Sequence, residues 1–106
     1  AENALFYVAS RPLKLDEKAR GLVDDEGRRS LARLRVMFAG APNWMAKELE
    51  EQVRASADGS GSRLGVVAQP LRAALTGSAV SPGIFEVAEA LGRDETLGRI
   101  DDALAN

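Results

Sequence analysis

The sequence predicts an all-α protein, an irregular bundle of five to six short helices. Three observations support this fold class. Apolar residues recur at helical spacing along most of the chain, turn-forming residues divide it into segments of helical length, and no stretch sustains the two-residue alternation of a strand. With 106 residues, the chain is long enough for one domain, residues 1–106, and too short for two independent cores.

The first predicted helix is short. Asp16 can cap a helix that runs to about Val23, because its carboxylate can accept from the exposed first-turn N–H groups. Glu17 is then favourably placed in the first turn. Before it, the apolar run Leu5-Phe6-Tyr7-Val8 is a candidate for a short extended piece.

Two longer helices follow. The second is expected over residues 25–38 and ends at Gly40-Ala41-Pro42; Pro42 or Asn43 then opens the third. Asp58-Gly-Ser-Gly-Ser62 is rich in Gly and Ser and predicts a flexible loop after the third helix. The apolar positions that define these two helices are Leu31, Leu34 and Phe38, then Met45, Leu49 and Val53.

The fourth helix is expected to start close to Pro70, because proline is poorly tolerated inside a helix. Gly77 is a natural C-terminal stop. Ser81 as cap and Pro82 at the first helical position then predict the start of a fifth helix, which Gly92 ends. Asp94 can cap a last helix. The apolar faces of these three helices are Val67, Leu71, Ala74 and Leu75; Ile84, Val87, Ala88 and Leu91; and Leu97, Ile100 and Leu104.

Composition argues against several classes of function. The chain contains no His and no Cys, which removes the commonest general base near neutral pH, the usual zinc ligands, thiol nucleophiles and disulfides. No apolar run approaches the roughly 18 residues of a membrane span, and no signal peptide is visible. Because Ala1 is not an initiator Met, we expect a processed or truncated chain. We also expect a cytoplasmic location and no metal site.

Charge is unevenly distributed along the chain. The net charge of −2 argues against a nucleic-acid binder held by bulk electrostatics. Residues 59–85, however, contain no acid and two arginines, Arg63 and Arg72, whereas residues 86–106 contain six acids and two arginines. If RNA contacts this chain, we expect the contact in the acid-free stretch.

Three motifs in the second half occur in the order and at the spacing of one known family. They are Pro70-Leu-Arg-Ala-Ala-Leu-Thr-Gly77, Ser81-Pro-Gly-Ile-Phe-Glu86 and Leu91-Gly-Arg-Asp-Glu-Thr-Leu97, followed by Arg99-Ile100. They resemble the closing segment of bacterial glutamyl-tRNA synthetases, also called glutamate–tRNA ligases. The resemblance is weaker upstream, at Arg11-Pro12, Asp16-Glu-Lys-Ala19 and the Trp44 helix.

The resemblance implies a parent enzyme, a class I aminoacyl-tRNA synthetase that attaches glutamate to its tRNA using ATP and magnesium. The family's nucleotide-binding signatures are absent from this chain, so it implies no catalytic residue and no cofactor here. It implies a monomeric α-helical module of anticodon-binding type that binds the anticodon loop of a glutamate-accepting tRNA, and neither DNA nor a membrane. Residues 1–41 would form a helical scaffold and residues 42–106 the anticodon-contacting helices.

Carried over residue by residue, the motifs place the anticodon contacts at five positions: Arg72, Ser81, Pro82, Gly83 and Ile84. The chemistry is compatible with this. A planar guanidinium can donate two bonds to a base edge or stack on an unpaired base, a helix start offers unpaired N–H groups, and a glycine permits close backbone approach.

Each of these residues also has an ordinary structural interpretation. Arg72 could pair with a carboxylate such as Glu86 or Asp102, and the Ser-Pro-Gly start could serve as plain helix capping. Phe85 is a further candidate for stacking on a base, while Trp44 is expected to pack in the core. The basic residues of the second helix are expected to form an ordinary charged helix surface; they are Arg28, Arg29, Arg33 and Arg35.

Two other functions are compatible with the sequence. A helical protein–protein adaptor derived from a synthetase would share the same fold, and a gene that continues upstream into a nucleotide-binding domain would favour the ligase instead. A small carboxylate-based hydrolase lacks a candidate acid pair with supporting residues. Whether the parent charges only glutamate tRNA or also glutamine tRNA depends partly on residues outside this chain.

Overall fold

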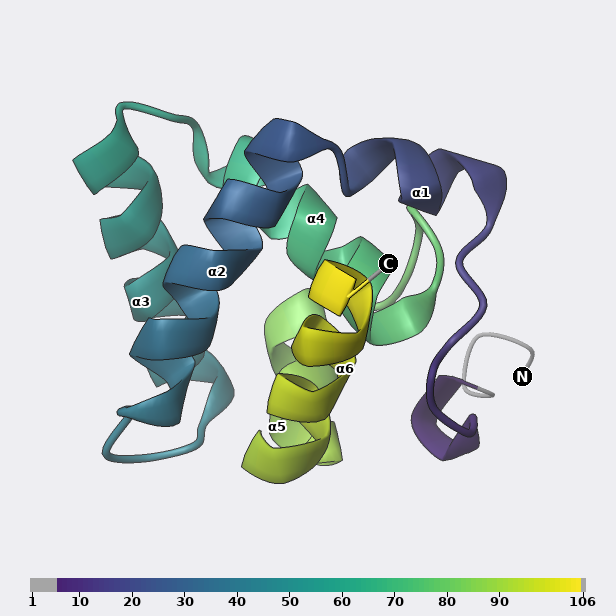
Figure 1. Ribbon diagram of the computed structural model, residues 1–106. Coiled ribbons are helices and arrows are strands. Elements are labelled where there is room, and N and C mark those ends of the chain that lie inside the picture. Colours follow the sequence, from purple (N-terminus) through teal and green to yellow (C-terminus); the bar gives the residue numbers. More distant parts are fainter. Residues whose placement is uncertain (1–5, 106) are drawn as a thin grey trace.

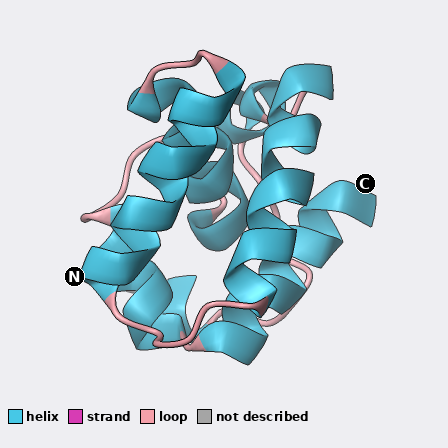
Figure 2. Cartoon of the chain, turned by 90° about the vertical axis from the view of Figure 1, so that its left-hand side faces the viewer, coloured by secondary structure: helices cyan, strands magenta, loops and turns pink. Residues whose placement is uncertain are grey.

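The computed structural model describes residues 6–105, which consist of helices and the segments that connect them (Figures 1 and 2). This confirms the all-α fold class. No described helix is both long enough and apolar enough to cross a membrane. The α-helices are α1 (Glu17–Leu22), α2 (Asp25–Ala39), α3 (Ala46–Ser60), α4 (Leu64–Thr76), α5 (Ile84–Leu91) and α6 (Arg93–Ala105).

Helix α4 lies at the centre of the bundle and packs against all five other helices (Figure 1). Its sequence explains this position, because apolar residues occur on most of its circumference and its acid-free composition leaves few groups that need water. The hydrophobic core forms around it from the predicted apolar faces of α2, α3, α5 and α6. The helices that meet α4 therefore determine where its C-terminal end projects.

The predicted start of α4 near Pro70 is wrong, because the helix begins at Leu64 and Pro70 lies inside it. Proline interrupts the backbone ladder, since it has no N–H to donate to the carbonyl four residues earlier. Here Pro70 is buried, and the surrounding Val67 and Leu71 are fully buried as well. Burial of this central helix by its neighbours offsets the lost hydrogen bond.

The predicted loop over residues 58–62 is also partly wrong, because α3 continues through Ser60. The Ser60 hydroxyl donates back to the carbonyl of Ser56 at 3.0 Å, so the side chain supports the last turn. Gly61 ends the helix in the left-handed conformation, with φ of 71°. Helical hydrogen bonding therefore persists across a composition that predicts a loop.

The start of α3 lies later than Pro42 or Asn43, because residues 40–45 form a connection held by Trp44. The Trp44 indole donates to the carbonyl of Ala88 at 2.8 Å, and its ring meets Phe38 edge-on at 5.6 Å between centroids. Met45, expected on the apolar stripe, instead precedes the helix and is exposed. Trp44 packs as predicted.

The starts of the last two helices differ from the predicted ones. α5 begins at Ile84 after Gly83, without a side-chain cap, so Ser81 does not cap it. α6 begins at Arg93, and the N–H of Thr96 donates to the carbonyl of Gly92 at 3.0 Å; Asp94 therefore lies in the first turn rather than at the cap.

The N-terminal segment crosses the end of α4. Residues 6–8 form a 3-10 turn rather than the expected extended piece, and Leu5 lies outside the described residues. Asp16 caps α1 as predicted, accepting from the N–H of Ala19 at 2.8 Å. Its own N–H donates to the carbonyl of Gly77 at 2.9 Å. This bond joins the segment that precedes α1 to the turn that follows α4.

Candidate nucleic-acid interface

The candidate site is the turn between α4 and α5. Gly77 ends α4 in the left-handed conformation, with φ of 76°, and its N–H donates to the carbonyl of Ala73 at 2.9 Å. A glycine is required at this position, because a Cβ there would lie 2.9 Å from the carbonyl oxygen of Lys14. Residues 78–83 then reverse the chain, and Ser81 comes to lie beside the last turns of α4.

Arg72 is the central side chain of this site. It is half-buried, its Nε donates to the Ser81 hydroxyl at 2.9 Å, and its Nη1 donates to Oε1 of Gln69 at 3.1 Å. Among the described residues, no ion pair includes Arg72, so the expected alternative of a bond to Glu86 or Asp102 is not seen. Both of its partners are neutral.

Ile84 and Phe85 contribute less side-chain surface than the sequence suggests. Ile84 is only 2% exposed, so its side chain belongs to the core, and only its backbone could reach a ligand. Phe85 is half-buried and packs against the same core. Pro82 and Gly83 are exposed. The turn thus brings Arg72, Ser81, Pro82 and Gly83 together at the surface and withdraws the Ile84 side chain from it.

A carboxylate lies over the start of α5. A Cβ built on Gly83 would collide with Oε1 of Glu86, so the Glu86 side chain folds back over the glycine. An acid in the first turn is favourable for the helix dipole. The same carboxylate occupies the space that Gly83 would otherwise leave for a base. A ligand that approaches this backbone must therefore displace Glu86.

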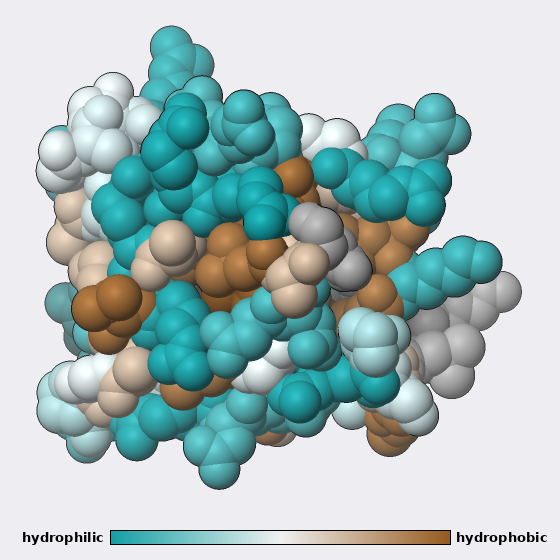
Figure 3. Space-filling model, in the orientation of Figure 1, coloured by the Kyte–Doolittle hydropathy of each residue, from teal (hydrophilic) through white to brown (hydrophobic). Residues whose placement is uncertain are grey.

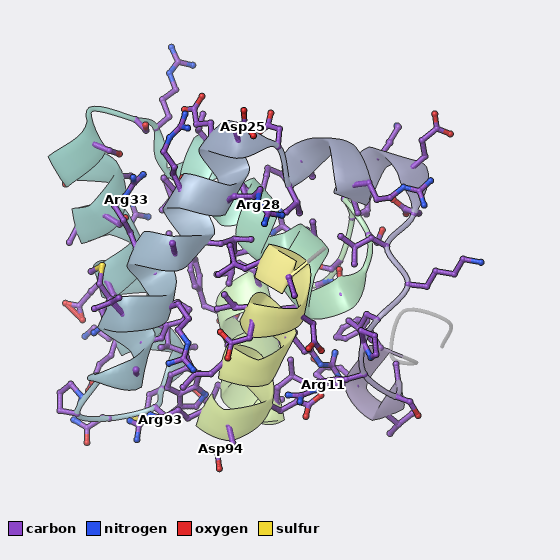
Figure 4. All side chains as sticks on the ribbon, in the orientation of Figure 1. Arg11, Asp25, Arg28, Arg33, Arg93 and Asp94 are labelled. Atoms are coloured by element: carbon purple, nitrogen blue, oxygen red, sulfur yellow. The ribbon has the colours of Figure 1, made fainter. Side chains whose placement is uncertain are left out.

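Two of the basic residues of α2, Arg28 and Arg35, form hydrogen bonds to α6 within the fold. The guanidinium of Arg28 lies between α2 and the C-terminal end of α6 (Figure 4) and donates to the carbonyls of Ala103 and Leu104. Arg35 donates to both carboxylate oxygens of Asp101 at 2.9 and 3.0 Å. These bonds lower the pKa of Asp101 and raise that of Arg35. This supports the structural interpretation for Arg28 and Arg35.

Gln69 is the part of the site that sequence reasoning leaves without a role. It stands three positions before Arg72 on the same helix, a spacing at which side chains meet. That spacing is the one signal in the sequence that could have indicated the contact. The bond from Arg72 to Ser81, nine residues away, required the path of the turn.

Comparison with known proteins identifies the family. The family described as "Anticodon binding domain" matches residues 1–104. The chain belongs to this family. It is 55% identical over 103 residues to Glutamate–tRNA ligase 2 of Rhodospirillum centenum, and this match covers 97% of this chain and 22% of that protein. It is 54% identical over 104 residues to Glutamate–tRNA ligase 2 of Rhizorhabdus wittichii, and this match covers 98% of this chain and 22% of that protein.

The fold of the domain also matches a solved structure. The crystal structure of a glutamate tRNA ligase from Elizabethkingia meningosepticum, in complex with its amino acid, superposes with a TM-score of 0.89 at 25% identity. The match covers 99% of this chain and 21% of that one. The domain thus spans about a fifth of the length of the relatives it matches.

Proposed function

We propose that this chain is the anticodon-binding domain of a glutamate–tRNA ligase and that it binds the anticodon loop of a glutamate-accepting tRNA. The ligases that it matches across nearly its whole length support the family of the parent enzyme. The observation that carries the RNA-binding part is the environment of Arg72, a surface arginine held only by neutral oxygens in a stretch without acids.

That environment suits RNA for an electrostatic reason. A guanidinium paired with a carboxylate has its charge balanced and its donor edge occupied, whereas Arg72 retains its charge and its outer N–H groups. A single-stranded loop offers splayed base edges and phosphates that accept from such groups. Arg72, Pro82 and Gly83 would contact the loop, with Ser81 completing this surface beside Arg72, Ile84 contributing its backbone and Phe85 a partly exposed ring.

The proposal extends to the organisation of the chain and its parent. Residues 1–41 would serve as scaffold, and residues 42–106, which include α4 and α5, would contain the anticodon contacts. The parent would attach glutamate to tRNA in the cytoplasm, with ATP and magnesium bound outside residues 1–106. Recognition of a loop requires one copy of the domain, so we propose that it acts as a monomer.

Binding by this domain alone should be local and weak. The net charge of −2 gives RNA no general attraction, and the face seen in Figure 3 is largely hydrophilic, with apolar areas at its centre and towards its sides. Affinity would therefore come from the few contacts around Arg72.

A binding experiment with matched RNAs tests the proposal. A fluorescently labelled anticodon stem-loop of glutamate-accepting tRNA is titrated with the 106-residue chain at low salt, alongside the same stem closed by an unrelated stable loop. We expect saturable binding to the anticodon loop and much weaker binding to the control. Equal affinity for the two hairpins, or no binding to either, would refute the proposal.

A further inference from the structure

The Ser81 hydroxyl makes two hydrogen bonds within the chain. It donates to the carbonyl of Pro82 at 2.8 Å and accepts from Nε of Arg72 at 2.9 Å. A hydroxyl has one proton to donate, and an arginine has no acceptor, so the direction of both bonds is fixed by chemistry. Ser81 therefore has no proton left for a base while these bonds persist.

Arg72 is held at two of its three nitrogens. Ser81 accepts from Nε, and Gln69 accepts from Nη1 at 3.1 Å. A guanidinium has five N–H donors, so three remain: both on Nη2 and the second on Nη1. Because the group is planar, fixing two nitrogens fixes the direction of the outer edge that carries these donors.

We infer that Ser81 is a positioning residue that acts on anticodon binding through Arg72, rather than by donating a hydrogen bond to a base itself. The inference rests on the proposed function and deepens it, because it separates the group that touches RNA from the group that orients it. Holding the guanidinium before RNA arrives reduces the rotamer entropy that binding must remove. Ser81 reaches Arg72 through the turn that follows Gly77, which ends α4 in the left-handed conformation.

The first test needs no RNA. In the free 106-residue chain, the NMR signal of the Arg72 Nε–H is expected to be shifted and protected from exchange with water by its bond to Ser81. Ser81→Ala should remove both effects, and Ser81→Thr, which keeps the hydroxyl, should restore them. Ser78→Ala is the matched control, because the Ser78 hydroxyl accepts from the N–H of Val80 in the same turn at 3.1 Å. An Arg72 signal unchanged by Ser81→Ala would overturn the inference.

The second test is a double-mutant cycle on affinity for the anticodon stem-loop. Ser81→Ala alone is expected to weaken binding about 3- to 10-fold, the effect of one hydrogen bond. In the Arg72→Ala background the same substitution should have no further effect, since the group it positions is gone. Ser81→Thr should bind better than Ser81→Ala.

The outcomes of the cycle are distinct. An equal loss from Ser81→Ala with and without Arg72 would show that Ser81 contacts RNA directly, and would overturn the inference while leaving the proposed function intact. A wild-type chain that does not distinguish the anticodon loop from the control hairpin would refute the proposed function instead. The free-chain NMR signal would still report whether Ser81 holds Arg72.

Discussion

Arg99 contacts the C-terminal half of α4 and Arg72 belongs to it, but the two arginines lie in different electrostatic environments. Arg99 comes from α6, is buried, and donates to the carboxylate of Glu95 at 2.7 Å and to the carbonyl of Leu75 at 2.7 Å. Arg72 comes from α4 itself, is half-buried, and donates only to the neutral oxygens of Ser81 and Gln69.

The difference separates a structural arginine from one available for binding. The Leu75 carbonyl lies in the last turn of α4 and lacks a helical partner, so Arg99 supplies one, and its charge is balanced by Glu95. Arg72 satisfies no such requirement of the fold, and its charge has no carboxylate partner among the described residues. Burial and partners therefore distinguish two arginines that the sequence places in equally well-matched motifs.

The largest expected effect is on stability. Arg99→Ala should lower the free energy of unfolding by about 2–4 kcal/mol, because it removes a buried side chain and leaves the Leu75 carbonyl unpaired. Arg54→Ala is the matched control: its pair with Glu50 has the same i,i+4 spacing, but the Arg54 side chain is 57% exposed, against 1% for Arg99. That control should cost about 0.5 kcal/mol or less. Urea unfolding measures both, and equal costs would contradict the structural role of Arg99.

The next effect is on binding. Arg72→Ala should weaken affinity for the anticodon stem-loop by about 1–3 kcal/mol, the usual cost of losing an arginine that contacts a base. Stability should change by less than about 1 kcal/mol, because the partners of Arg72 can bond to water. Fluorescence anisotropy and urea unfolding on the same variant provide both values. A large loss of stability with unchanged affinity would reverse the roles assigned to the two arginines.

A smaller effect is expected in the opposite direction. Glu86→Gln should tighten binding about 2- to 5-fold at low salt, because a carboxylate folded over Gly83 repels RNA, and salt should reduce the gain. Asp25→Asn is the control, since it removes an exposed first-turn acid from α2 rather than α5. Equal gains from both variants would indicate a general charge effect and no specific role for the α5 start.

The smallest effect concerns an exposed pair. Asp101 has a lowered pKa because it accepts from Arg35, so its pair adds stability above the unfolded pKa of about 3.9. That stability is lost as the pH falls through the still lower folded pKa. Asp101→Asn should therefore be slightly less stable than wild type near neutral pH and equal to it in strong acid. A stability difference independent of pH would contradict this assignment.

Much of the helical framework follows from local sequence. Periodic apolar positions such as Leu31, Leu34 and Phe38 predict α2, and Asp16 and Gly77 mark helix ends through their own backbone preferences. Boundaries fail where tertiary packing outweighs local preference. Pro70 lies inside α4 because the bundle encloses that helix, and Asp58–Ser60 remains helical despite its composition.

The sequence predicts which positions form the candidate site, but not how their side chains contact one another. The motif match indicates Arg72 and Ser81 as neighbours of the anticodon. The bond between them depends on the turn after Gly77, and the burial of Ile84 depends on how α5 meets the core. The position of Glu86 over Gly83 follows from a side-chain rotamer. None of these is encoded in spacing along a helix.

The most direct test of the central claim is to map the anticodon stem-loop on the chain by NMR. In backbone 1H–15N spectra at low salt, titration with the RNA should give saturable shifts centred on residues 69–86, with the Arg72 side-chain signals among those most affected. No shift in that segment at millimolar RNA, or shifts centred on the basic residues of α2, would contradict the assignment of the α4–α5 turn as the RNA-binding surface.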